Sequence, residues 1–403
     1  MSMTAFKNRH EVIIVGAGAG GLWLNFRLAE AGIDVMLMDG QNRAGRKLLI
    51  SGGGKCNVTN LSVSHSNYIG NNPGFCGDAL ARMTPQHVLS FLDEHGISWE
   101  ERDFGQIFLK RGAEELRDLF LRLGEKHGSF PLLGVKALGV HRKAEGFELK
   151  TSSGIFLTSK LVLATGSPAW PSCGADGSGL ALACSLGHSI VPPRPALTPL
   201  TMPGNRLLGE LAGISPVVGI SARKTGVKNY ILPLMLTHRG ISGPAALQVS
   251  SWLDAGDAVI IDWLPGETCE AMFGQPGAGR VLLANLLSRK LPPRLVRALV
   301  PDSLGGRKTA ELSRKDRDKV SELVHRYELL PLEPDFSKAE ACRGGVDTAE
   351  ICPRSMESRL VPGLFFVGEV LDVCGELGGY NLHWAWASSE AALAGCAGRG
   401  QKG

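Results

Sequence analysis

The sequence lacks an apolar run of the roughly 18 to 20 residues that a transmembrane helix needs, because Asp, Arg, Lys or Pro interrupts every candidate. The first 26 residues imitate a secretory signal peptide, since Lys7 and Arg9 precede the apolar stretch EVIIVGAGAGGLWLNF. Glu11 and the spacing of the glycines give this stretch a different explanation. We therefore expect a cytoplasmic protein that does not enter a membrane.

The nine cysteines include neither a CxxC pair nor a Cys/His cluster. Their odd number and scattered positions favour the reduced thiols of a cytosolic protein over disulfide bridges or zinc ligands, so no metal site is predicted. Internal repeats and low-complexity tracts are also absent. A nucleotide-hydrolysing phosphate loop is excluded, because Leu49 and Cys56 stand where that motif requires Gly and Ser or Thr around Lys55.

The chain has 403 residues, enough for two or three domains, and 52 of them are glycine. This glycine content exceeds the average of about 7% and indicates many close backbone approaches, as in a fold that wraps a ligand. From about Ala196 onward, Pro and Gly separate short β-like runs such as VVGISA and AVIIDWL, which indicates an inserted β-rich module. The buried-strand pattern returns in GLFFVGEV (363–370), and NLHWAWASSEAALAG predicts a final helix.

A dinucleotide-binding fingerprint opens the chain. The continuous apolar run at residues 11–15 is typical of a buried parallel strand, and a helix and a second strand ending at Asp39 follow it. Between strand and helix, Gly16 permits a tight turn, Gly18 lets a pyrophosphate approach the backbone, and Gly21 lets the helix pack closely on the strand. Asp39 is placed to accept hydrogen bonds from ribose hydroxyls. The alternative is a glycine-rich β–α turn without a ligand.

A second glycine-rich loop, SGGGKCN, follows at residues 51–57. Its backbone can run flat along an extended ligand because glycine carries no side chain. Arg46 and Lys47, which precede it, can add positive charge near the phosphates.

Five segments carry a resemblance to a known family: VGAGAGGLWLNFRLAEAG, GRKLLISGGGKCNVTN, LATGSPAWPSCGADGSGLALACSLGH, HRGISGPAALQVSSW and PGLFFVGEVLDVCGELGGYNLHWAWASSEAA. They resemble the bacterial HI0933-like, or BaiN/RdsA, family of NAD(P)/FAD-dependent oxidoreductases over nearly the whole chain. The resemblance implies an α/β fold in which both chain ends build a Rossmann-like FAD-binding domain. This domain would comprise residues 1–195 and 335–403, interrupted by a β-barrel-like module at 196–265 and a small basic helical module at 266–334.

The same resemblance implies the FAD contacts. The ADP half, with its phosphates and ribose, would be held by Gly16, Gly18, Gly21, Asp39, Arg46 and Lys47. The segment that runs beside the flavin would include Ser51, Gly52, Gly53, Cys56 and Asn57. The remaining cofactor-binding residues would be Gly166, Gly368, Glu369, Gly379, Tyr380, Asn381 and Leu382.

The segment GGYNLHWAW supports part of this assignment by its own physics. Two glycines stand directly before a helix, so unpaired N–H groups and the positive end of the helix dipole would face the N1/C2=O edge of the flavin. The alternative is an N-cap turn that serves only the helix.

The chain departs from the family pattern in two places. Cys342 and Arg343 stand where the family tends to have a Val-Thr-like pair, and Phe108-Leu109 replaces the usual Phe-Pro of a GRVFP segment. We therefore expect the substrate face to differ from that of better-known members. Since only one dinucleotide fingerprint is present, the sequence locates no site for NAD(P)H, which stays a candidate electron donor.

No catalytic residue is identified from the sequence. A packing or cofactor-contact role is favoured over thiol–disulfide chemistry for Cys56, Cys342 and Cys374, because none has a CxxC partner. Three other residues either supply protons or substrate contacts or are ordinary surface and hydrogen-bonded core residues: His238, Arg239 and His383.

Residues 280–326 hold twelve Lys or Arg against five Asp or Glu, a local excess of seven in a chain whose net charge is +4. They form either a solvated helical face or a docking surface for RNA phosphates. The second interpretation gains support because some members of the family are implicated in reducing uridine to dihydrouridine in ribosomal RNA. Aromatic residues for base stacking are sparse there, Tyr327 being the nearest.

Three functions are therefore open. The protein is an FAD-dependent oxidoreductase that acts on a small molecule, a ribosomal RNA uridine reductase that docks structured RNA on the basic segment, or a flavin-bound sensor without catalytic activity.

Overall fold

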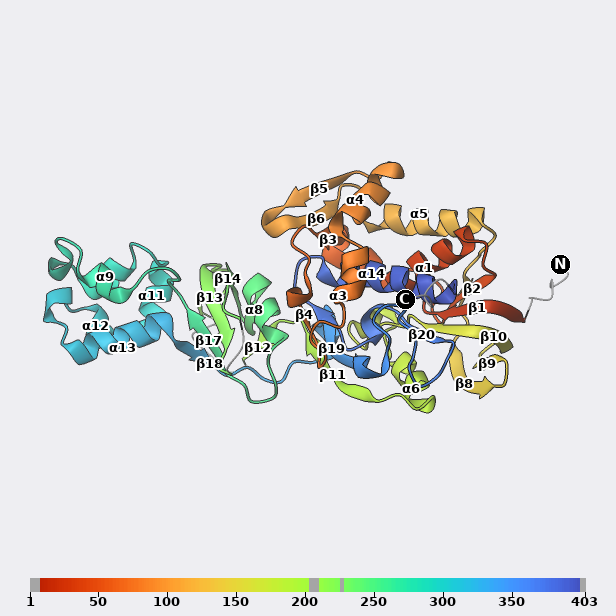
Figure 1. The fold of residues 1–403 in the computed structure, drawn as a ribbon. Coiled ribbons are helices and arrows are strands. Elements are labelled where there is room, and N and C mark those ends of the chain that lie inside the picture. Colours follow the sequence, from red (N-terminus) through yellow and green to blue (C-terminus); the bar gives the residue numbers. More distant parts are fainter. Residues whose placement is uncertain (1–7, 203–209, 225–227, 399–403) are drawn as a thin grey trace. The chain divides into compact units, whose positions relative to one another are not determined.

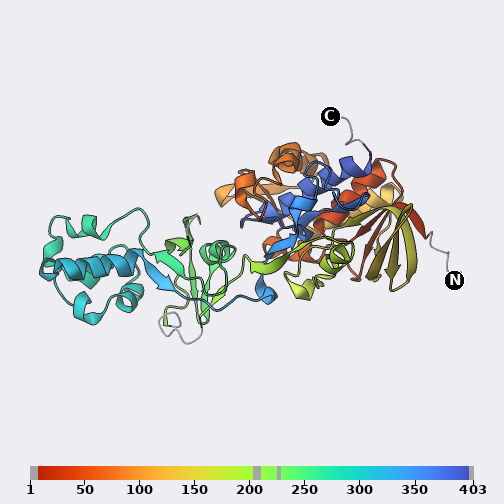
Figure 2. The ribbon, with the colours of Figure 1, turned by 60° about the horizontal axis from the view of Figure 1, so that its bottom comes forward.

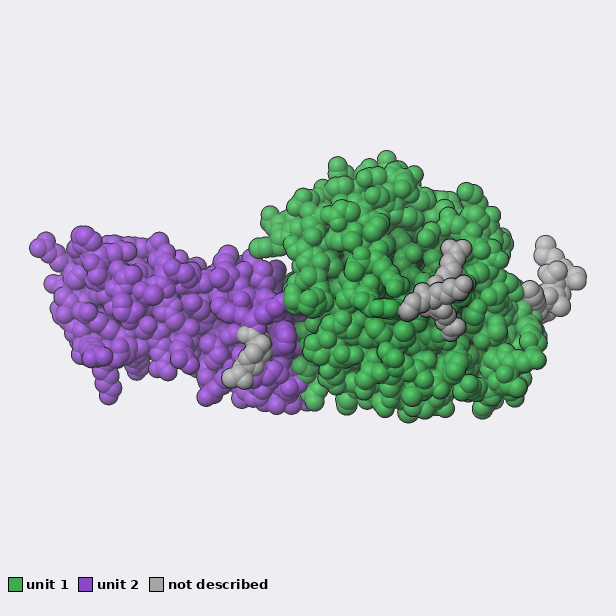
Figure 3. Space-filling view, in the orientation of Figure 1, with its two compact units in different colours: residues 1–194, 341–403 green, residues 195–340 purple. Residues whose placement is uncertain are grey.

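The computed structural model describes residues 8–202, 210–224 and 228–398. The chain forms two compact units: unit 1 comprises Met1–Arg194 and Ala341–Gly403, and unit 2 comprises Pro195–Glu340 (Figure 3). The expected α/β fold, with a Rossmann-like domain assembled from both chain ends, is confirmed. Both predicted inserted modules, 196–265 and 266–334, fall within unit 2.

Unit 1 is built on a seven-stranded sheet with the order β7-β2-β1-β10-β9-β8, in which β20 also pairs with β10. Strands β7, β2, β1, β10 and β20 pair in parallel, whereas β8, β9 and the start of β10 form an antiparallel meander. Figure 2 shows this meander as olive strands side by side. The strands are β1 (Arg9–Val15), β2 (Val35–Asp39), β7 (Leu132–Leu133), β8 (Ala137–Lys143), β9 (Gly146–Thr151), β10 (Gly154–Leu163) and β20 (Leu364–Phe366).

The predicted strand at 363–370 is shorter than expected. Strand β20 ends at Phe366, and Gly368 adopts a φ of +73° that starts the 3₁₀ turn η9 (Gly368–Val370). Periodicity could not reveal this end, because Gly368 and Val370 of the turn are buried like the residues of the strand.

Helices α1 (Ala19–Glu30) and α14 (Tyr380–Cys396) pack against each other and unite the two ends of the chain (Figure 1). The Ser389 hydroxyl donates to the carbonyl of Gly20 at 3.0 Å, and the rings of Trp23 and Trp386 lie 5.3 Å apart. Most of α14 is buried, which explains why its sequence has no continuous polar face. The other helices of unit 1 are α2 (Arg46–Ile50), α3 (Gly77–Arg82), α4 (Pro85–Glu94), α5 (Ala113–Lys126) and α6 (Ser178–Ser185).

Smaller sheets surround this helix pair. Strands β3 (Asn57–Asn60), β6 (Gln106–Leu109) and β5 (Trp99–Arg102) form an antiparallel sheet in the order β3-β6-β5. Two further pairs join distant parts of the sequence: β4 (Tyr68–Ile69) with β21 (Cys374–Gly375), and β11 (Ile190–Ala196) with β19 (Ala341–Val346).

Unit 2 has one hydrophobic core to which both its strands and its helices contribute. Its strands are β12 (Leu200–Thr201), β13 (Val217–Ala222), β14 (Tyr230–Pro233), β15 (Met235–Thr237), β16 (Gly240–Ser242), β17 (Val259–Asp262) and β18 (Tyr327–Leu329). Its helices are α8 (Gly243–Ser250), α9 (Cys269–Phe273), α10 (Leu283–Leu287), α11 (Pro293–Leu299), α12 (Asp302–Gly305) and α13 (Arg314–His325). Helices α9 to α13 lie between β17 and β18 in the sequence. Because β18 pairs with β17, this helical segment begins and ends at the same sheet.

Candidate functional site

The GxGxxG turn has the backbone geometry that its three glycines predict. Gly16 has a φ of +112°, and a side-chain carbon there would come within 2.4 Å of the Ala164 carbonyl oxygen. A side-chain carbon at Gly21 would come within 1.9 Å of the Gly16 carbonyl oxygen. Gly18 differs from both, because apart from its chain neighbours no heavy atom of the described residues lies within 4 Å of the position of its missing side chain. The turn is therefore tight at its ends and open at its centre.

The open position coincides with the start of helix α1. Gly18 is the N-cap residue, and none of the described side chains caps the helix. The first N–H groups of a helix have no partner within the helix and carry the positive end of its dipole. These donors and this space fit the pyrophosphate of a dinucleotide.

Asp39 at the end of β2 stabilises the GxGxxG turn by hydrogen bonds. Its Oδ2 accepts from the backbone N–H of Ala17 at 2.7 Å, and its Oδ1 accepts from that of Gln41 at 2.8 Å. A carboxylate oxygen has two lone pairs, so each can accept a further bond. Contact of Asp39 with a ribose stays a prediction.

Lys47 and Glu369 are two predicted cofactor residues from opposite ends of the chain, and they form an ion pair of 2.6 Å. Glu369 Oε1 also accepts from the Cys342 amide at 3.0 Å. Arg46 donates to the side chain of Gln41 and, at 2.7 Å, to the carbonyl of Ser172. Both cations therefore also tie α2 to other segments, and their contact with phosphates stays a prediction.

The second glycine-rich loop meets the glycines that precede α14. Gly379 has a φ of +98°, and a side-chain carbon there would come within 2.4 Å of the Thr59 carbonyl oxygen. The side chain of Asn60 donates to the carbonyl of Gly378 at 2.9 Å. Gly52, at a φ of +55°, packs against Phe108, whereas Gly53 has open space around it. A side-chain carbon at Gly379 would also come within 2.8 Å of Asn57 Oδ1, so segments 51–57 and 378–382, both predicted to lie beside the flavin, are neighbours.

The start of α14 is also uncapped, because Gly379 is its N-cap and no side chain in the described part of the chain accepts a cap hydrogen bond from its first turn. Two of the residues predicted to contact FAD form hydrogen bonds within the protein here. Asn381 bonds to the N–H and the C=O of Gly375 at 2.8 and 3.0 Å, and the carbonyl of Tyr380 accepts from the Tyr68 hydroxyl at 3.0 Å. Leu382 is half-buried beside them.

Gly368 and Gly166 complete the predicted set. The N–H of Gly368 donates to Ser388 Oγ at 2.9 Å, and its carbonyl accepts from Trp384 Nε1 at 3.1 Å, so α14 holds both groups. Gly166 has a φ of +70° and open space at its missing side chain.

The two uncapped helix starts lie in one structural unit. Helix α14 touches Gly20 of α1 through Ser389, ten residues after Gly379. At 1.5 Å per helical residue, these ten residues span about 15 Å. The two helix starts are therefore separated along α14 by nearly three turns.

Three residues at the junction of the glycine segments have no sequence motif to mark them: Thr59, Asn60 and Gln106. Thr59 and Asn60 only close the segment GRKLLISGGGKCNVTN. The side-chain amides of Gln106 and Asn57 lie within hydrogen-bond distance at 2.8 Å, and this contact depends on the register in which β6 pairs with β3. Register between distant strands cannot be deduced from their sequences.

The cysteines near the junction are buried free thiols. Burial raises the pKa of Cys56 and of Cys342 to about 12 and raises that of Cys374 well above its ordinary value. Because thiolates are the reactive form of cysteine, these residues are inert at neutral pH. Within the described ranges, no three His, Cys, Asp or Glu side chains cluster as metal ligands.

The three polar candidates lie in different environments. His238 and Arg239 are exposed in the turn between β15 and β16 of unit 2. His383 is fully buried in unit 1, where Nδ1 bonds to Thr59 Oγ1 and Nε2 to the carbonyl of Met83, both at 2.7 Å. His383 therefore occupies a hydrogen-bonded core position.

His383 should make unit 1 sensitive to acid. Burial lowers its pKa to about 4, so the unfolded state binds more protons between pH 6.5 and 4, and stability falls as the pH falls. We expect a loss of up to about 3 kcal/mol in the free energy of unfolding across this window. Urea titrations should show a weaker pH dependence for His383→Gln than for the wild type; parallel curves would contradict the assignment.

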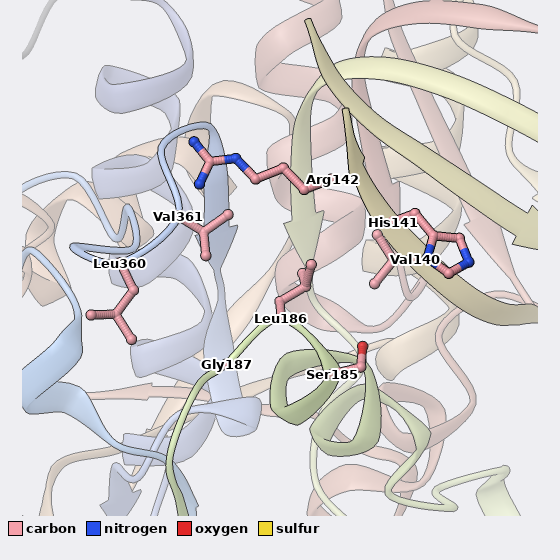
Figure 4. Close-up of a pocket in the computed structure, with 8 residues that line it drawn as sticks. All are labelled: Val140, His141, Arg142, Ser185, Leu186, Gly187, Leu360 and Val361. Carbon is pink, nitrogen blue, oxygen red and sulfur yellow. The ribbon is translucent and has the colours of Figure 1, made fainter. Parts of the chain in front are cut away.

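A shallow pocket of about 390 Å³ in unit 1 is lined by none of the predicted cofactor residues (Figure 4). Near it, His188 bonds to Glu350 at 2.9 Å and to Ser358 Oγ at 2.8 Å, which is the order of groups in a hydrolase triad. However, Ser358 Oγ also accepts from the amides of Leu360 and Val361, and His188 is buried. These bonds anchor the backbone rather than activate a nucleophile.

None of the helices in the described residues is both long and apolar enough to cross a membrane. The chain folds like a structure titled Mycobacterium smegmatis Sdh1 complex in the apo form, with 15% identity and a TM-score of 0.51. That match covers 98% of this chain and 69% of the other.

Closer similarity appears at the level of sequence. A protein of Escherichia coli named ribosomal RNA dihydrouridine synthase is 37% identical over 95% of this chain and 97% of its own. A Haemophilus influenzae protein of the same name is also 37% identical, over 94% and 97%. A Clostridium scindens protein named 3-dehydro-bile acid delta(4,6)-reductase is 30% identical over 93% and 96%. The profile described as HI0933-like protein Rossmann domain matches residues 10–395. The chain therefore belongs to the HI0933-like family of FAD-dependent oxidoreductases.

Proposed function

We propose that both ends of the chain bind one FAD molecule in unit 1. The uncapped start of α1 and the open space at Gly18 would hold the pyrophosphate, with Asp39 next to a ribose. The start of α14 at Gly379 would favour negative charge at the N1/C2=O edge of the flavin. Bound FAD supplies hydride transfer, and the chain supplies orientation and electrostatics. NAD(P)H is the proposed electron donor.

The reaction class follows from what the named relatives have in common. Uridine has a C5=C6 double bond conjugated to a carbonyl group, and the name 3-dehydro-bile acid delta(4,6)-reductase also denotes double bonds conjugated to a ketone. We infer that this chain reduces a carbon–carbon double bond conjugated to a carbonyl group. The product gains one hydride and one proton.

The proposed substrate is a uridine of ribosomal RNA, and the observation that carries this choice is the unpaired basic surface of unit 2. Lys290 and Arg307 have acidic partners, Glu267 at 2.8 Å and Asp316 at 3.0 Å. Other basic residues of 280–326 are exposed, with no ion pair to any described residue: Arg280, Arg289, Arg297, Arg314, Lys315, Lys319 and Arg326. Such a surface attracts phosphates, because their neutralisation releases counterions.

The test compares ribosomal RNA from wild-type and deletion cells. We expect dihydrouridine to be lost from ribosomal RNA in the deletion strain and to return when the purified flavoprotein and NAD(P)H are added to that RNA. Ribosomal RNA with the same dihydrouridine content in both strains would refute the RNA substrate while leaving the FAD site intact.

A small planar enone is the second candidate substrate, favoured by the relative named as a bile acid reductase. It predicts that steroid enones reoxidise the reduced flavoprotein under anaerobic conditions, whereas ribosomal RNA does not. Rapid flavin bleaching by NADH or NADPH, followed by stopped flow, would exclude the alternative of a passive flavin-bound sensor.

A further inference from the structure

Phe104 combines two features that are unfavourable for a phenylalanine. It lies in the 3₁₀ turn η3 (Asp103–Gly105) at the tip of the β5–β6 hairpin, with φ +60° and ψ +29°. A bulky residue rarely adopts this left-handed conformation, which persists only where the surrounding structure enforces it. Its side chain is 66% exposed, so burial of the ring does not compensate for the strain.

The conformation is enforced by Asn60, which is almost completely buried. Asn60 Nδ2 donates to the carbonyl of Phe104 at 3.1 Å and to that of Gly378 at 2.9 Å. Its Oδ1 accepts from the amide of Ser62 at 2.9 Å. One nitrogen atom thus fixes the hairpin tip against the glycines that precede α14.

The hairpin also touches both glycine segments, 51–57 and 378–382, through other residues. A side-chain carbon at Gly378 would come within 3.3 Å of Gln106, and one at Gly52 would come within 2.8 Å of Phe108. Phe104 therefore stands beside the place where the flavin is proposed to bind, and most of its ring is free.

We propose that Phe104 is a substrate-binding residue that stacks on the uracil base as the base lies against the flavin. This inference rests on the proposed function. A base presented for reduction must leave its own stack, and an aromatic side chain at the rim supplies a replacement surface. Phe104 would thus provide the base-stacking aromatic that the basic segment lacks.

The experiment compares variants in the reduction of a ribosomal RNA fragment. Asn tolerates the left-handed conformation, so Phe104→Asn should keep the fold while removing the ring. We expect a KM for RNA that is about 10-fold to 100-fold higher, as for one lost stacking contact, with the Kd for FAD and the rate of flavin reduction by NAD(P)H unchanged. Phe104→Tyr should restore the wild-type KM.

Phe130 offers a matched control, because it is 67% exposed in unit 1 and no described contact links it to the glycine segments. Phe130→Asn should leave the KM for RNA unchanged. A wild-type KM in Phe104→Asn would overturn the proposal, and so would a weaker Kd for FAD, because the ring would then serve the cofactor.

A binding measurement separates this inference from the proposed function. Phe104→Trp should show fluorescence quenching upon addition of a uridine-containing RNA, beyond the change seen in the wild type. Quenching in a protein that does not reduce RNA would refute the proposed function but support the stacking contact. If RNA is reduced without quenching and the KM of Phe104→Asn is normal, the stacking contact is refuted and the proposed function is not.

Discussion

Replacement of Gly18 by aspartate is expected to give a folded protein that no longer retains FAD. The backbone of Gly18 is extended, at φ −76° and ψ −169°, and space for a side chain is open, so aspartate fits without strain. Its carboxylate would accept hydrogen bonds from the first turn of α1 and cap the helix. The same carboxylate would take the donors proposed for the pyrophosphate and repel its charge.

Gly18→Asp should therefore weaken FAD binding but stabilise the apoprotein. A carboxylate beside a phosphate near a protein surface costs about 4 kcal/mol at 4 Å, so affinity for FAD should fall at least about 100-fold. The apoprotein should be more stable by a few tenths of a kcal/mol, the usual gain when an N-cap Gly is replaced by Asp. Flavin absorbance after purification, FAD titration of the apoprotein and its thermal unfolding measure both quantities.

Gly77→Asp is the control, because Gly77 is the first residue of α3 and, outside its own helix, no heavy atom of the described residues lies within 4 Å of its missing side chain. It adds the same charge to the start of another helix and should retain FAD. If Gly18→Asp bound FAD as tightly as the wild type, α1 would not hold the pyrophosphate.

Reversal of three charges on α13 is expected to weaken RNA binding strongly without loss of FAD. Arg314, Lys315 and Lys319 are exposed on this helix and have no ion pair with any described residue. Each phosphate contact that is lost reduces the slope of log K against log salt concentration by about 0.7 to 0.9. The triple Glu variant should therefore lower the slope by about two to three and weaken binding by more than about 10-fold at low salt.

The fold should tolerate these three changes. Arg314 and Lys315 are the first two residues of α13, where glutamate is favoured by the helix dipole. Unit 1 has its own hydrophobic core, so flavin content should be unchanged. The control variant carries Glu at three exposed basic positions of unit 1: Lys126, Arg142 and Lys150. Equal losses of RNA affinity in both variants would show that only net charge matters and would refute a docking surface on α13.

The sequence was sufficient to predict the dinucleotide turn because its requirements are local. Gly16 needs a positive φ, Gly21 needs close contact between a helix and a turn, and the strand before them needs a continuous apolar run. All three features lie within one β–α unit, so short-range pattern and sterics determine them. Resemblance to a family supplied the rest of the prediction, above all that FAD requires both chain ends.

The junction around Asn60 could not be predicted in this way. Asn60 bonds to Gly378, Lys47 pairs with Glu369, and Thr59 bonds to His383, each across more than 300 residues. Such pairs depend on the packing of α14 against α1 and β3, which no local pattern encodes.

By itself, the sequence determined the local elements: the glycine turn, the apolar strands and the basic composition of 280–326, because each depends on neighbours in the chain. Only the tertiary structure decided which of these groups meet. In the packed structure, His383 and Cys56 are buried, and Asp39 and Asn381 form hydrogen bonds with backbone groups. Phe104 is exposed and adopts a strained conformation. The physical reason is that burial, pKa and strain are properties of the packed environment, which distant segments create together.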